Sequence, residues 1–159
     1  FKGKIDNFLK ILDLEHDAEF LEKTEPLGLP NPIPDSKVES LIVELNTRLS
    51  LAGARHERAK TALASVESII DIVKKTWISI KSIMEDKKWK IDADFTFLAK
   101  DLLVGRADIE EHYNIWKNRT EVLNDCYTRV SRILTAKQLV DQNTISKPSY
   151  PVRDSKWGK

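Results

Sequence analysis

The sequence predicts an all-α protein: an elongated antiparallel helical hairpin or coiled-coil bundle with short N-terminal helices and an extended C-terminal tail. Two observations support this prediction. Apolar residues recur in alternating steps of four and three over most of the chain, which is the spacing of a helical seam. Glycines and prolines number only five and six, and four of the prolines lie within residues 26–35, so long stretches elsewhere are free to be helical.

The N-terminal part, residues 1–25, is predicted to form short helices. One helix is expected over 3–13, where four apolar side chains share a face: Ile5, Phe8, Leu9 and Leu12. A second is expected over 16–23. The segment that follows, PLGLPNPIPD at 26–35, holds four prolines and a glycine, so we expect a stiff, extended connector.

Residues 36–143 are predicted to be the hairpin, with its first arm over 36–88. Ser36 and Glu39 have the spacing of a capping box at the start of this arm. A regular seam follows without a slip: Val38, Ile42, Leu45, Leu49, Ala52, His56, Ala59, Leu63, Val66, Ile70, Val73, Trp77, Ile80 and Met84. Gly53 lies off this seam and is expected to weaken the helix without ending it.

The second arm is predicted over 94–141, after a turn at 89–94 with Asp92 or Asp94 as the helix cap. Its apolar spacing shifts by one residue near Gly105, so we expect a bend or break between a helix over 94–104 and one over 107–141. A turn centred near 89–90 would pair residues whose numbers sum to about 179, by simple antiparallel counting along two helices. Ala52 would then face Tyr127.

The tail, residues 144–159, contains prolines and polar residues without a period, so we expect it to be extended or flexible. Its aromatic and basic residues are candidates for binding a partner: Tyr150, Arg153, Lys156 and Trp157. Of the other tryptophans, Trp77 and Trp116 fall on the seam and are predicted to lie in the core. Trp89 lies at the predicted turn, where it could either cover the end of the bundle or be exposed.

The net charge is only +1 with both signs nearly balanced, which gives little support to a dedicated duplex-DNA protein. The cations of the first arm nevertheless define a candidate basic face: Arg48, Arg55, Arg58, Lys60, Lys74, Lys75, Lys81, Lys87 and Lys88. This face could bind nucleic acid or an acidic partner. The alternative is a solvated face that pairs with acids on the other helices, such as Glu110, Glu111 and Glu121.

The sequence contains no phosphate-binding loop, dinucleotide fingerprint, serine elbow or cysteine–histidine cluster, so no enzyme, cofactor or metal site is predicted. Asp108 and His112 are spaced to offer two metal ligands, which is too few for a site. Cys126 is the only cysteine, which excludes an intrachain disulfide and favours a reducing intracellular compartment. No apolar run approaches the ~20 residues of a membrane span, and no membrane partner is expected.

These observations favour a non-enzymatic helical interaction or structural subunit. It would assemble with protein partners, or with itself as a homo-oligomer, through a coiled-coil surface and the C-terminal tail. The alternative is a nucleic-acid-binding accessory protein that uses the basic stretch 48–88 and the lysine- and tryptophan-containing tail.

Overall fold

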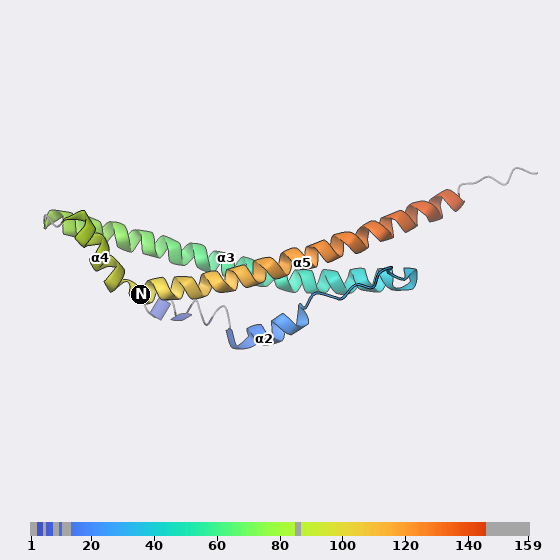
Figure 1. The fold of residues 1–159 in the computed structure, drawn as a ribbon, viewed down its shortest axis with the longest axis horizontal. Coiled ribbons are helices and arrows are strands. Elements are labelled where there is room, and N and C mark those ends of the chain that lie inside the picture. The colour runs from blue at the N-terminus through green and yellow to red at the C-terminus, as the bar shows by residue number, and fades with distance from the viewer. Residues whose placement is uncertain (1–2, 5, 8–9, 11–13, 85–86, 146–159) are drawn as a thin grey trace, which may run out of the picture.

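The structure is a computed structural model that describes residues 3–4, 6–7, 10, 14–84 and 87–145. The elements are α2 (Leu14–Lys23), a 3-10 turn η1 (Asp35–Lys37), α3 (Val38–Ile83), α4 (Lys88–Leu98) and α5 (Lys100–Ile145). α3 and α5 run in opposite directions and pack along much of their length, while α4 lies at the closed end of the hairpin (Figure 1). The predicted all-α helical hairpin is therefore confirmed.

The hairpin core confirms the predicted seam over most of α3. Fully buried side chains alternate between the two arms, and the bulkiest of them is Trp116, which is 2% exposed as predicted for a core residue. The buried seam positions are Val38, Leu45, Ala52, Ala59 and Val66 on α3, facing Ile109, Trp116, Leu123 and Val130 on α5. The last two predicted seam positions are not buried: Ile80 is 52% exposed and Met84 is 63% exposed.

The N-terminal part confirms a short helix, since α2 covers the second helix predicted there. The first predicted helix lies largely outside the described residues. α2 is held against α3 by Phe20, whose ring lies 3.9 Å from the guanidinium carbon of the buried Arg55. After it the connector contains neither helix nor strand up to Pro34, as its prolines predict. Arg48 ties this connector to α3 by donating a hydrogen bond to the carbonyl of Glu25 at 2.5 Å.

The predicted capping box at the start of α3 is wrong. The chain enters the helix through η1, which contains Ser36, and no side chain caps the helix at Lys37. The hydroxyl that bonds here is that of Ser40, which donates to the Lys37 carbonyl at 3.0 Å. Pro34 has an extended backbone just before η1, and the first turn of the chain after it has 3-10 geometry.

The turn of the hairpin lies earlier than predicted, between Ile83 and Lys88. Asp92 and Asp94 are therefore inside α4 and cap nothing. The chain also breaks at a different place, because Ala99 separates α4 from α5 while α5 continues unbroken through Gly105. The one-residue shift near Gly105 is absorbed within the helix, since a 3.6-residue turn accommodates two consecutive steps of four.

The earlier turn changes which residues meet across the hairpin. The helix ends at Ile83 and Lys88 give partner numbers that sum to 171, where the sequence predicted about 179. His56 accordingly stacks on Tyr113 with ring centroids 5.2 Å apart, and Glu67 accepts a hydrogen bond from Arg106 at 2.7 Å. Those pairs sum to 169 and 173. The predicted register, with Ala52 facing Tyr127, is therefore wrong by about 12 Å along the helix axis.

Arg106 links the two arms of the hairpin, α3 and α5. Its guanidinium donates to Glu67 on α3 and to Glu110 one turn along α5, each at 2.7 Å. The hydrogen bond to Glu67 raises the pKa of Arg106 above its ordinary value, so the guanidinium of Arg106 keeps its positive charge at any accessible pH. The bridge thus favours one register of the two arms.

Candidate functional site

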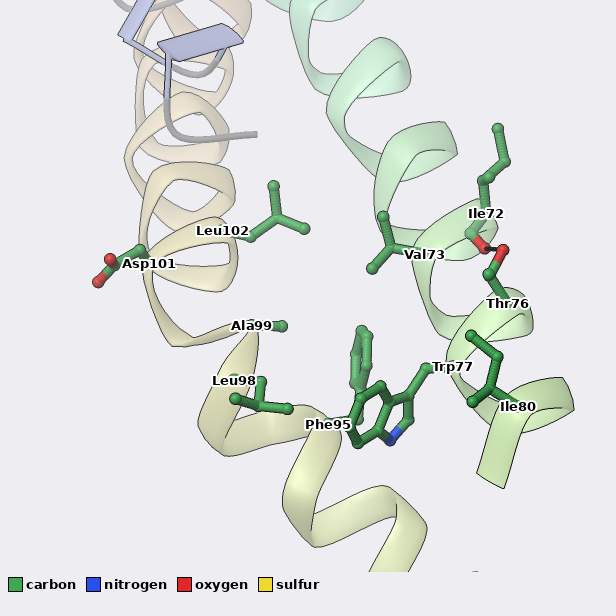
Figure 2. Close-up of a pocket in the computed structure, with 10 residues that line it drawn as sticks. All are labelled: Ile72, Val73, Thr76, Trp77, Ile80, Phe95, Leu98, Ala99, Asp101 and Leu102. Carbon is green, nitrogen blue, oxygen red and sulfur yellow. Dashed lines mark hydrogen bonds between the residues drawn. The ribbon is translucent and has the colours of Figure 1, made fainter. Parts of the chain in front are cut away.

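An apolar groove opens between α3, α4 and the first turn of α5 at the closed end of the hairpin (Figure 2). Its volume is about 430 Å³. Eight of its ten lining residues are apolar, and the complete lining is Ile72, Val73, Thr76, Trp77, Ile80, Phe95, Leu98, Ala99, Asp101 and Leu102. A concave apolar surface with few polar groups is the usual character of a binding site.

The groove exists because α4 turns away from the axis of α5 at Ala99. The floor consists of three residues at or beside this break, which are buried against α3: Phe95 at 7%, Ala99 at 8% and Leu102 at 6% exposure. Trp77 packs against this floor, and its indole nitrogen donates a hydrogen bond to the carbonyl of Ile91 at 3.2 Å. Trp77 is therefore only half-buried, at the edge of the core in which the sequence placed it.

The walls of the groove expose large aliphatic side chains to solvent. Ile72 and Ile80 on α3 are 61% and 52% exposed, and Leu98 on α4 is 64% exposed. Helical spacing continues the α3 wall toward the tip of the hairpin through Ile83, which is 84% exposed. Large apolar side chains gathered at one end of a molecule, beside a concavity, are typical of a surface that another protein covers.

The charges around the groove differ between its two edges. Beside the α3 wall, Lys75 is paired with Asp71 at 2.6 Å, and Lys81 lies over the ring of Trp77 at 5.0 Å. On the opposite edge lies Asp101, and no ion pair to it is found among the described residues. The carboxylate of Asp101 extends outward from the apolar lining (Figure 2). A ligand that extends past this edge would therefore meet the carboxylate of Asp101.

Most cations of the candidate basic face are engaged with neighbouring groups. In the part of α3 near α2, Arg48 bonds Glu44 at 2.6 Å, Lys60 lies 3.5 Å from Glu57, and Arg55 is 7% exposed over the ring of Phe20. Arg58 is exposed beside them. These four residues form one group at the α2 end of the face.

The remaining cations of the face lie near the tip of the hairpin. Lys74 lies 3.9 Å from Asp92, Lys75 pairs with Asp71, and Lys81 lies over the ring of Trp77 at 5.0 Å. Lys87 and Lys88 are exposed at the start of α4. The basic face is thus divided between two regions of the molecule, and its role in binding stays a prediction.

The four tail residues predicted to bind a partner, Tyr150, Arg153, Lys156 and Trp157, lie outside the described residues. So does the side chain of Trp89. The groove itself was not predicted, because the seam pattern assigned Trp77, Ile80 and Phe95 to a closed core. One signal was present in the sequence: Ile72, Ile83 and Leu98 are apolar, and the first two lie off the seam.

Among the described residues, the other chemistry-bearing side chains do not gather into a second site. Within the described ranges no three side chains among histidine, cysteine, aspartate and glutamate are close enough together to hold a metal ion. Cys126 is a half-buried free thiol packed beside the core. No helix in the described part of the chain is both long enough and apolar enough to cross a membrane.

Comparisons with protein-family models, with curated proteins and with solved structures gave no significant match to this chain. The class of the protein therefore follows from its own features, an all-α helical hairpin with an open apolar groove at its closed end.

Proposed function

We propose that this chain is a non-enzymatic helical subunit that assembles with a protein partner, or with a second copy of itself, through the groove. The observation that supports the proposal is the exposure of Ile72, Ile80 and Leu98 around a concave apolar floor. Covering such side chains contributes about 25 cal/mol for each Å² of apolar surface removed from water. A groove of this shape suits an apolar anchor from another polypeptide.

The sequence predicted assembly through a coiled-coil surface and the C-terminal tail. In the folded chain most of the predicted seam is buried between α3 and α5, so it is not free to bind. The open remainder is the end of the seam at Ile80 and Met84, which adjoins the groove. The proposed interface is accordingly confined to the closed end of the hairpin.

The experiment compares groove variants with a matched control. Ile80→Glu and Leu98→Glu each place a charge in the groove wall at positions that are already more than half exposed, so the fold should tolerate them. Val43→Glu makes the same change at a site 67% exposed near the start of α3. Self-association is measured by sedimentation equilibrium, and co-purifying proteins are compared between wild type and each variant.

We expect both groove variants to lose self-association, or to lose one defined set of co-purifying proteins, while Val43→Glu behaves as wild type. If all three variants and the wild type bind the same partners with the same affinity, the groove is not the binding surface. Circular dichroism melts of each variant distinguish lost binding from lost folding.

A further inference from the structure

The groove combines an apolar floor with one carboxylate at its edge, Asp101, and this combination indicates what kind of segment fits it. Phe95 and Leu102 form a floor that suits a large apolar or aromatic anchor. Asp101 lies at one edge of the groove and has no ion-pair partner among the described residues, so it suits a cation next to that anchor. The complementary ligand is a short peptide segment with aromatic and basic residues close together.

The chain itself contains such a segment in its tail, SKPSYPVRDSKWGK at 146–159. Tyr150 and Trp157 are aromatic anchors, and Arg153 and Lys156 lie between them or beside them. The tail has four cations against the single acid Asp154. Its net charge is therefore opposite to that of Asp101 at the groove edge.

The length of α5 prevents a tail from reaching the groove of its own chain. Asp101 lies at the first turn of α5 and Ile145 at its end, so the two are separated by about 66 Å at 1.5 Å per residue. The 12 residues from Ile145 to Trp157 span at most ~42 Å when fully extended. Figure 1 shows the groove elements and the end of α5 at opposite ends of the molecule. Only the tail of another copy can reach.

We infer that the tail of one chain docks in the groove of a second copy, with Trp157 on the apolar floor and Arg153 or Lys156 beside Asp101. This inference rests on the proposed function and names the segment that fills the groove. Two copies that exchange tails in this way form a closed dimer with two equivalent contacts.

The test is a complementation between two full-length variants. Leu98→Glu damages the groove and leaves the tail intact, whereas Trp157→Ala damages the tail and leaves the groove intact. A homodimer of either variant would lack both tail–groove contacts. We therefore expect each variant alone to self-associate at least tenfold more weakly than wild type, as measured by sedimentation velocity. Mixed one to one, they regain one contact, and heterodimers should form more tightly than either variant forms homodimers.

Two controls and one probe complete the experiment. Val43→Glu and Ser155→Ala should both leave self-association unchanged. A fluorescent peptide of residues 144–159 should bind wild type, bind Asp101→Lys at least several-fold more weakly, and show little binding to Leu98→Glu. The affinity of wild type for this peptide should also decrease as salt is added, because salt screens the attraction between charges.

Several outcomes would overturn the inference. A chain that stays monomeric at every concentration and does not bind the peptide lacks this contact altogether. If Leu98→Glu abolishes association but Trp157→Ala leaves it unchanged, the groove binds a different segment, and the proposed function stands without the tail. A mixture that associates no better than its two components also excludes tail exchange.

Discussion

At the scale of single residues, His56 places a polar ring between the two arms. Its Nε2 is buried and has no hydrogen-bond partner in the described structure, and its ring packs on Tyr113 between the two arms. A buried polar atom without a partner carries a desolvation penalty of about 1–3 kcal/mol. The stacking with Tyr113 offsets only part of this penalty.

We therefore expect His56→Leu to increase the free energy of unfolding by up to ~1–2 kcal/mol, because it removes the unpaired nitrogen and keeps similar volume. Urea denaturation at neutral pH measures the effect. His56→Gln is the control, since it retains a polar group in the same place and should not stabilise. A Leu variant less stable than wild type would show that the histidine makes a favourable interaction that the apolar side chain cannot replace.

At the scale of elements, α2 depends on α3 for its place. Ten residues are too few for a stable isolated helix, so α2 needs tertiary contacts. Phe20 makes one such contact, because its ring lies under the guanidinium of Arg55. Cation–π contacts that exclude water contribute about 1–2 kcal/mol, and the phenyl ring adds apolar burial.

Phe20→Ala should therefore release α2 from α3 while the hairpin stays folded. We expect trypsin to cleave after Lys23 several-fold faster in this variant, because local opening is easier when the contact is lost. The matched control is Phe97→Ala, since Phe97 is 80% exposed on α4 and contributes little to the fold. Equal cleavage rates in both variants would show that α2 is held by other groups.

The register of α3 against α5 is a second property at this scale, and the stacking of His56 on Tyr113 makes it measurable. His56→Cys with Tyr113→Cys, in a Cys126→Ser background, should be crosslinked within one chain by a short bismaleimide. Ala52→Cys with Tyr127→Cys should not, because a register shift of about eight residues separates them by about 12 Å. The reverse result, in dilute protein to prevent crosslinks between chains, would restore the register expected from the sequence.

At the scale of the whole molecule, the hairpin is a rod with its apolar groove at one end and the end of α5 at the other (Figure 1). α3 and α5 have 46 residues each, or about 69 Å. This shape explains why the tail and the groove can meet only between copies.

The rod shape also predicts the scattering of the isolated chain. A compact domain of 159 residues has a radius of gyration of about 15 Å, whereas a rod of about 69 Å has one of ~20 Å or more. Small-angle X-ray scattering extrapolated to zero concentration should give the larger value. A result near 15 Å would mean that the arms fold back on themselves in solution, and the distance between groove and tail would no longer hold.

The sequence by itself determined the fold class, the two long arms, the proline connector and the side chains that fill the core between Val38 and Val66. Those features depend on local spacing and on proline chemistry, both of which can be read along the chain. Trp116 could be assigned to the core for the same reason.

Only the tertiary structure decided the turn, the register and the groove. Residues 84–94 contain no glycine or proline to mark a turn, so several positions were equally compatible with the local pattern. The helix breaks at Ala99 without any breaking residue, and α4 tilts across the end of α3 with Phe95, Ala99 and Leu102 buried. That same tilt leaves Ile72, Ile80 and Leu98 uncovered, and a seam pattern cannot show how far two helices diverge.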